Sequence, residues 1–239
     1  MKARLAVPML RAAACVLISL FCAHDRAVAT TLYDMDFTSP DVGSYSVVFG
    51  SPTIAPTFDG LVNALVLHAR VGYEQIRLPI GAGGPGYQLD FDVVTHGMQN
   101  TDYNFNMLVD SPGVHSAEFF GHTSQMLVYP PYTPLTVLQP FVDDTIYHLG
   151  ITLDLTHHYW SVSVGNSMLF SNYFGDTVID GIRFSCGPQY LPGTTDLSVE
   201  AAIDNIRVTT IPEPSVFALT LSSLAVLFGV RKGFRPPRT

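Results

Sequence analysis

The chain has 239 residues, of which 12 are basic and 20 acidic, and its formal net charge is −8. The charge is more one-sided in the middle, because residues 30–211 hold four arginines, no lysine and 18 acidic residues, a net charge of −14. A domain this acidic repels phosphate backbones, which excludes nucleic acid as a partner.

The N-terminus has the three parts of a secretory signal peptide. Positive charge at Lys2, Arg4 and Arg11 precedes an apolar run over 12–23, and a small-residue triplet ends at Ala29. We therefore predict a signal helix in residues 1–29, with the cleavage site marked by Ala27 and Ala29. The run is shorter than the about 20 residues of a membrane-spanning helix, although an uncleaved anchor or a buried first helix is the alternative.

Residues 30–211 read as a single all-β domain. Short runs rich in Val, Ile, Thr, Tyr and Phe recur between Gly, Pro, Asn and Asp, a pattern typical of antiparallel strands. Alternation over 160–164 marks a strand with one buried face, so Trp160 belongs to the core, and Gly165-Asn166 predicts a hairpin turn. The expected strands cover 32–37, 44–49, 61–69, 73–79, 86–95, 103–110, 116–121, 125–129, 146–153, 158–164, 167–171, 178–185 and 198–209.

The domain contains one cysteine, Cys186, so it has no internal disulfide. A small buried residue is favoured over a reactive thiol. Stability must therefore come from the core, to which a bound metal ion could add.

The C-terminus, residues 212–239, combines three features in order. Pro212-Glu213-Pro214 is followed by the uncharged apolar segment 215–230, and basic residues including Arg231 and Lys232 come next within 231–239. This order resembles the PEP-CTERM sorting signal of Gram-negative bacteria. The resemblance implies export, transient anchoring in the inner membrane by a C-terminal transmembrane-type helix, and processing by an exosortase-like enzyme. The implied destination is the cell envelope or an extracellular matrix, in bacteria that often make exopolysaccharide.

Many antiparallel strands in about 180 residues predict a two-sheet β-sandwich. The segments 148–154 and 159–170 resemble a hairpin of concanavalin-A-like and laminin-G-like jelly rolls. The segment 201–208 resembles the closing strand of those domains, which lies beside the N-terminal strand, here 32–37. The resemblance implies a jelly roll but no particular activity.

No catalytic constellation is visible. Retaining glycosidases of this fold carry paired carboxylates on one strand face, and the nearest pair here, Asp90 and Asp92, lacks glutamates and reads as a solvated strand face. Glu74, Glu118 and Glu200 are well separated along the chain. We therefore expect a non-catalytic protein.

Calcium is the metal best suited to the sequence, because it prefers carboxylate and carbonyl oxygens. The jelly-roll resemblance places Asp34 and Asp36 on the first strand beside Asp204 on the closing strand, where their carboxylates would converge on a structural calcium. Local hydrogen bonding by Asp204-Asn205 is the alternative. The histidines, including the adjacent His157 and His158, lack the spacing of a zinc site.

Carbohydrate binding needs exposed aromatic rings and nearby amides. Tyr129 and Tyr132 flank two prolines, and Tyr103 lies among asparagines, so these three tyrosines are the candidate ligand-binding residues. The competing interpretation is that each is an ordinary strand tyrosine whose hydroxyl stays in contact with water. Three functions stay open: a non-catalytic exported envelope or matrix protein, a carbohydrate-binding module for polysaccharide, and a divergent glycoside hydrolase or lyase.

Overall fold

The computed structural model describes residues 28–212 apart from 39–40, 42, 72, 82–83, 100–101, 113, 123–124, 130–133 and 189–194. Among these residues no helix is long and apolar enough to cross a bilayer. The predicted signal helix, as far as residue 27, and the predicted helix in 215–230 lie outside the described residues, as do Ala27, Tyr132, Glu213, Pro214, Arg231 and Lys232. Ala29 and Pro212, at the two ends of the described chain, are exposed.

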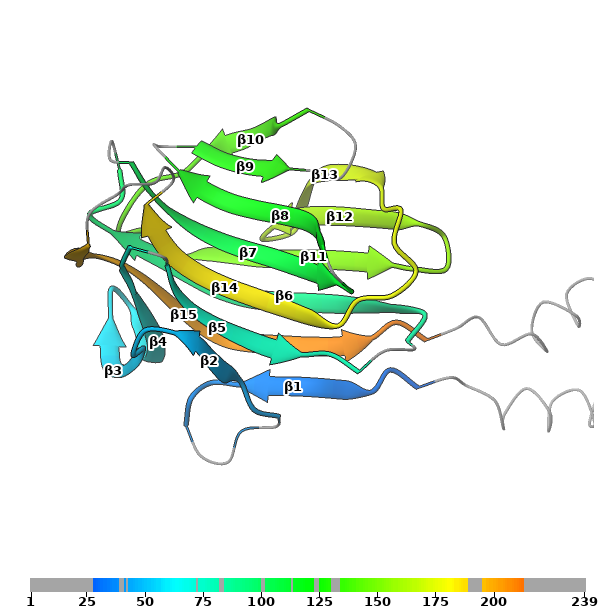
Figure 1. Ribbon diagram of the computed structural model, residues 1–239, viewed down its shortest axis with the longest axis horizontal. Coiled ribbons are helices and arrows are strands. Elements are labelled where there is room, and N and C mark those ends of the chain that lie inside the picture. Colours follow the sequence, from blue (N-terminus) through cyan, green and yellow to red (C-terminus); the bar gives the residue numbers. More distant parts are fainter. Residues whose placement is uncertain are drawn as a thin grey trace, which may run out of the picture. The chain divides into compact units, whose positions relative to one another are not determined.

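The predicted two-sheet antiparallel sandwich is confirmed for residues 30–211 (Figure 1). The first sheet runs in the order β13 (Ser167–Tyr173), β12 (Tyr159–Val164), β11 (Tyr147–Asp154), β6 (Gly86–His96), β15 (Asp196–Thr210), β4 (Leu61–Ala69) and β3 (Thr53–Phe58). The second sheet runs in the order β10 (Thr136–Pro140), β9 (Gln125–Tyr129), β8 (Val114–His122), β7 (Tyr103–Ser111), β14 (Gly181–Pro188), β5 (Glu74–Pro79) and β2 (Ser46–Phe49).

The closing strand pairs with the first strand, as the sequence predicts. Along one edge β15 pairs with β6. Along its other edge it pairs first with β4 and then with β1 (Thr31–Met35). Asp34 lies opposite Arg207 in this register. Figure 1 shows blue β1 and orange β15 side by side.

Side chains from both sheets interlock between the layers. Phe91 of the first sheet packs edge-on against Phe184 of the second, with ring centroids 4.9 Å apart. Trp160 is fully buried, which confirms its predicted core position, and its ring meets Phe170 at 5.1 Å. Cys186 is also fully buried, and burial raises the pKa of its thiol, so it is a packing residue rather than a nucleophile.

Two strands were not predicted, β3 and β10. Both contain a proline, Pro56 and Pro140, and both lie at the edge of a sheet. Proline is compatible with an edge strand, because the missing N–H is not needed by a further neighbour. The predicted β12–β13 hairpin is confirmed, with Gly165 at φ 56°.

Candidate functional site

The outward face of the first sheet carries a bulge in β15. Ile203 and Ile206 both point into the core, so the two residues between them, Asp204 and Asn205, must be accommodated by a register shift. Asn205 adopts φ 51°, a left-handed conformation that asparagine tolerates better than most residues. The bulge places Asp204 directly opposite Asp92 of β6. Such bulges re-aim side chains next to functional sites.

A pocket of about 390 Å³ opens at this bulge. Its polar wall includes Asp36, Asp92, His148 and Asp204, and its apolar wall comes from Leu61, Val62 and Ile146. A second pocket of about 380 Å³ adjoins it, because Asp92, His148 and Asn205 line both. The two volumes are at the lower end of the roughly 300–1,000 Å³ seen for small-molecule sites.

Hydrogen bonds hold the shared residues in position. The side-chain amide of Asn205 donates to Oδ2 of Asp92 at 2.7 Å, and the Nδ1 atom of His148 contacts Oδ1 of Asp92. The backbone N–H of Asn205 donates to Oδ1 of Asp204 at 2.7 Å. The local hydrogen bond considered for Asp204-Asn205 is therefore present. Both carboxylates are anchored to the same bulge.

Two aspartates that line the pocket, Asp204 and Asp36, differ in electrostatic environment. Burial, reinforced by the charges of Asp92 and Asp36, raises the pKa of Asp204, which is only 5% exposed. Hydrogen bonds from the hydroxyl and N–H of Thr38 lower the pKa of Asp36. The pocket therefore contains one carboxyl, Asp204, that ionises less readily than usual and one, Asp36, that ionises more readily.

The second pocket is floored by the strands β6, β11 and β12. Gly150 lies between Asp90 and Ser163, and a Cβ atom there would come within 2.6 Å of the Ser163 hydroxyl. Glycine thus keeps the floor open. Arg207, Asp90 and the Ser163 hydroxyl present hydrogen-bonding groups to this pocket.

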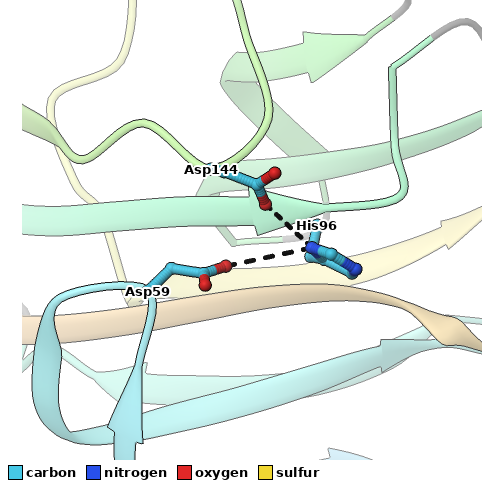
Figure 2. Close-up of side chains that lie close together, drawn as sticks. All are labelled: Asp59, His96 and Asp144. Carbon is cyan, nitrogen blue, oxygen red and sulfur yellow. Dashed lines mark hydrogen bonds and ion pairs between the residues drawn. The ribbon is translucent and has the colours of Figure 1, made fainter.

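A separate ionic cluster forms at Asp59, His96 and Asp144 (Figure 2), three exposed residues whose ligand atoms all lie within 4.8 Å of one another. The Nδ1 atom of His96 lies 2.8 Å from Oδ1 of Asp144 and 3.9 Å from Oδ2 of Asp59. The hydrogen bond to Asp144 raises the pKa of His96, and the charge of Asp59 adds to the effect. Within the described residues this is the one group with such spacing, and the sequence did not suggest it.

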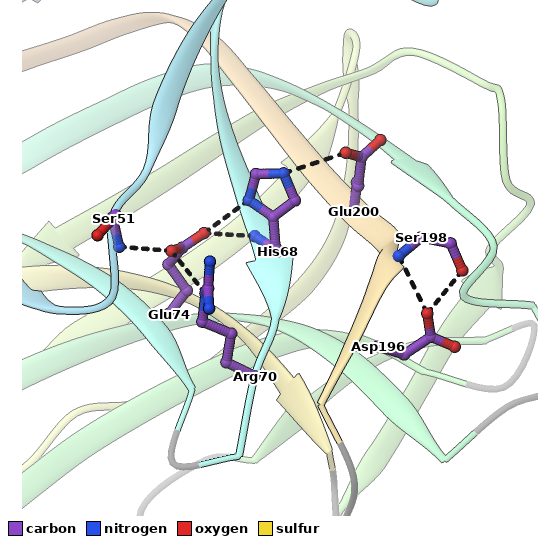
Figure 3. A network of polar contacts seen from close by, with 7 residues as sticks. All are labelled: Ser51, His68, Arg70, Glu74, Asp196, Ser198 and Glu200. Carbon is purple, nitrogen blue, oxygen red and sulfur yellow. Dashed lines mark hydrogen bonds and ion pairs between the residues drawn. The ribbon is translucent and has the colours of Figure 1, made fainter.

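A buried network joins the two sheets at Glu74 (Figure 3), which is fully buried. Its Oε1 accepts from the N–H of Ser51 at 2.6 Å and from Arg70, and its Oε2 accepts from the N–H of His68 at 2.6 Å and contacts the ring of His68 at 2.9 Å. Burial would raise the pKa of Glu74, but these hydrogen bonds outweigh it and lower the pKa. Glu200 contacts the opposite nitrogen of His68 at 3.2 Å. The two glutamates, well separated in sequence, thus meet across one histidine ring.

The structure brings only some of the predicted site residues together. Asp36 and Asp204 line the same pocket, whereas Asp34 is exposed on β1 and lines neither pocket. Tyr129 is exposed at the end of β9, and Tyr103 is half-buried against the core. Sequence reasoning missed Asp92 as a site residue and did not single out His148, although the alternation of polar residues in 88–92 was visible. A structural calcium stays a prediction.

No protein-family model matches the chain, and no curated protein sequence matches it. Solved structures do match. A sialidase aligns over 70% of this chain and 17% of its own, with TM-score 0.56 and 12% identity. The binding domain of botulinum neurotoxin serotype D aligns over 82% of this chain and 51% of its own, with TM-score 0.57 and 9% identity. The serotype D ligand binding domain in complex with N-acetylneuraminic acid aligns over 80% and 50%, with TM-score 0.55 and 10% identity.

This chain thus spans about half of each neurotoxin domain it matches and a small part of the sialidase. Identities this low carry information about the fold and not about residues or activity. Residues 30–211 form a two-sheet antiparallel β-sandwich that resembles these solved structures in fold.

Proposed function

We propose that this protein is an exported, non-catalytic carbohydrate-binding protein whose ligand occupies the two adjoining pockets on the outward face of the first sheet. The observation that supports this most is the composition of the pockets: fixed carboxylates and an amide face one apolar wall. Sugars present hydroxyls on their edges and C–H groups on their faces, so a site with both kinds of wall suits them.

The non-catalytic part of the proposal rests on the glutamates. Glu74 and Glu200 approach each other only through His68, and Glu74 is fully buried with its two oxygens occupied by donors. A carboxylate in that position has no access to a glycosidic bond. It stabilises the junction of β4 and β5 instead.

Binding can be tested with a glycan array probed by the full-length chain. Asn205→Ala removes the donor that orients Asp92, so it should weaken binding about tenfold or more, the loss expected when a charged acceptor loses its partner. Gln125→Ala, on an exposed position of β9, is the matched control and should bind as the parent does. Absence of binding to every neutral and charged glycan would contradict the proposal.

Export and sorting form a second part of the proposal, supported by the sequence of the two ends. Residues 1–29 would direct the chain through the export machinery, and residues 212–239 would anchor it in the inner membrane until an exosortase-like enzyme processes it. The destination would be the envelope or an exopolysaccharide-containing matrix. Deleting 212–239 should change the cell fraction that contains the protein, and identical fractionation of the full and truncated chains would disprove the sorting role.

A divergent glycoside hydrolase or lyase is the second candidate, because Asp92 and Asp204 face one pocket. Burial raises the pKa of Asp204, and a carboxyl with a raised pKa near a second carboxyl is an arrangement that general acid–base pairs use. Release of reducing ends from a polysaccharide, abolished in Asp204→Asn, would favour the enzyme. Binding without release over extended incubation would favour the binding protein.

A further inference from the structure

The two pockets concentrate negative charge. Asp36, Asp92 and Asp204 line the first pocket, and Asp90 adds a fourth carboxylate in the second. Arg207 is the one arginine or lysine among the described residues that line them.

Arg207 is itself surrounded by acids. In the sheet it lies opposite Asp34 on one side and opposite Asp90 on the other, and all three side chains are exposed on the same face. Opposite charges in directly facing positions attract one another. Arg207 lines the second pocket and not the first, so its positive charge lies beside Asp34 and Asp90 in the sheet and not beside Asp92 and Asp204.

Asp92 and Asp204 face each other in the register of β6 and β15, although like charges in such positions are destabilising. The donors at hand are the Asn205 amide, the backbone N–H groups of Asn205 and Val62, and a histidine ring, so the pair has no permanent cation among the described residues of the pocket. A ligand with a positive group would relieve this repulsion.

We infer that the glycan bound in these pockets carries free ammonium groups, as in a de-N-acetylated amino-sugar polymer, an inference that rests on the proposed function. An ammonium group has three N–H donors to offer the carboxylates of Asp36, Asp92 and Asp204 that line the first pocket, where it would replace mutual repulsion by attraction. The Asn205 amide donates to Asp92 and the Ser163 hydroxyl donates to the Gly150 carbonyl, so their side-chain oxygens remain as acceptors for the sugar hydroxyls.

The same charges select against acidic sugars. A carboxylated sugar such as the N-acetylneuraminic acid held by one structural neighbour would place a further carboxylate among the aspartates of the first pocket. Like-charge contacts at an interface suppress binding of the wrong partner. This domain thus shares the fold of that neighbour and differs from it in the charge of its ligand.

A bare metal ion fits the pocket less well than an ammonium group. In the described residues, the group of side chains with ligand atoms within 4.8 Å of one another is Asp59, His96 and Asp144, outside both pockets. Asp36, Asp92 and Asp204 are spread more widely around their pocket, which suits a larger cation that donates hydrogen bonds.

The test compares one polymer with and without its charge. Binding of the full-length chain to polyglucosamine oligomers is measured by calorimetry beside binding to the same oligomers after complete N-acetylation, to a neutral glucan and to polysialic acid. We expect binding to the amine form at least about tenfold tighter than to the acetylated form, and weaker at high salt because the contacts are charged. Measurements with calcium and with a chelator should agree.

Variants separate the pocket from the overall charge of the domain. Asp92→Asn and Asp204→Asn should each weaken amine binding about tenfold, whereas Asp102→Asn, exposed and outside both pockets, removes the same charge and should have little effect. Equal losses in all three variants would show that binding depends on the overall charge of the domain and not on the pocket. That result would overturn the inference. Thermal melting of each variant excludes unfolding as the cause.

Failure of the charge inference can be distinguished from failure of the proposed carbohydrate binding. Binding of the acetylated, neutral or sialic acid polymer as tightly as the amine polymer overturns the charge inference but leaves carbohydrate binding in place. Binding that requires calcium also overturns it, because the pocket would then hold the ion. Absence of binding to every polymer overturns both the inference and the proposed function.

Discussion

Replacing Glu74 by glutamine tests whether the buried network of Figure 3 stabilises the sandwich. The two oxygens of Glu74 accept four hydrogen bonds, from Ser51, Arg70 and twice from His68. Glutamine keeps one carbonyl oxygen but turns an NH₂ group toward donors in either orientation. At least one buried N–H then lacks an acceptor.

The cost follows from the burial of these groups. A buried donor left without a partner costs about 1–3 kcal/mol, and charge-assisted hydrogen bonds contribute about 1.5–3 kcal/mol each. Breaking a buried ionic network by removing one partner typically costs about 3–5 kcal/mol. We therefore predict that Glu74→Gln lowers the free energy of unfolding by about 3–5 kcal/mol, which lowers Tm by roughly 6–20 °C in a domain of this size.

Urea denaturation and thermal melting measure the effect, with Glu200→Gln as the matched control. Glu200 contacts the same His68 ring from the other side, but it is 26% exposed and makes one contact at 3.2 Å. Its substitution should cost less than about 1 kcal/mol. Equal effects of the two substitutions, or a loss below about 1 kcal/mol for Glu74→Gln, would refute the reasoning.

The pH dependence gives a second check on Glu74. Because its pKa is lowered in the folded state, its contribution is complete above the ordinary glutamate pKa of about 4.3 and is lost as the pH falls through the folded value. The difference between the parent and Glu74→Gln should therefore shrink in acid. A difference that is constant with pH would assign the loss to packing instead of charge.

Three further predictions concern other parts of the domain. The hydrogen bond to Asp144 raises the pKa of His96 in the folded state. The stabilisation that His96 contributes is therefore complete below the ordinary histidine pKa of about 6.5 and is lost as the pH rises through the folded value. His96→Gln should lower the free energy of unfolding more in mild acid than in base, as measured by urea titration at both pH values. Burial and neighbouring charges raise the pKa of Asp204, so ionisation of this carboxyl destabilises the fold as the pH rises. Asp204→Asn should therefore have a Tm no lower than that of the parent at neutral pH. A clearly lower Tm would contradict this. At Gly86 a methyl group would overlap the backbone carbonyl of Leu153 and lie 3.1 Å from the Cα atom of Asp154. Gly86→Ala should therefore lower the free energy of unfolding by about 1–3 kcal/mol, measured by urea denaturation. An unchanged denaturation midpoint would show that the backbone shifts to accommodate the methyl group.

Much of the fold was readable from local patterns. Alternating side chains in 160–164 and the Gly165-Asn166 turn identified β12 and its hairpin, because these features depend on neighbours in sequence. The expected pairing of the first and closing strands is also present, with Met35 opposite Ile206. β3 and β10 were not predicted because each contains a proline, which in sequence is more typical of a loop than of a strand.

The candidate site was only partly readable. Asp36 and Asp204 were predicted through the resemblance of the end strands, and they line one pocket. Asp92 was interpreted as part of a solvated strand face, which is correct for one strand considered alone. Its role appears only when β6 lies between β11 and β15, which brings His148 and Asn205 to it from positions 56 and 113 residues away.

By itself, the sequence determined what depends on composition and short-range periodicity: an acidic, lysine-free, disulfide-free middle domain made of strands, between ends that resemble export and sorting signals. The tertiary structure alone decided which carboxylates meet. The order of strands in a sheet is set by contacts between residues far apart in the chain, and a single bulge at Asp204-Asn205 turns one face of that sheet into a pocket. The convergence of Glu74 and Glu200 on His68 has the same origin, because β4, β5 and β15 meet only in the folded domain.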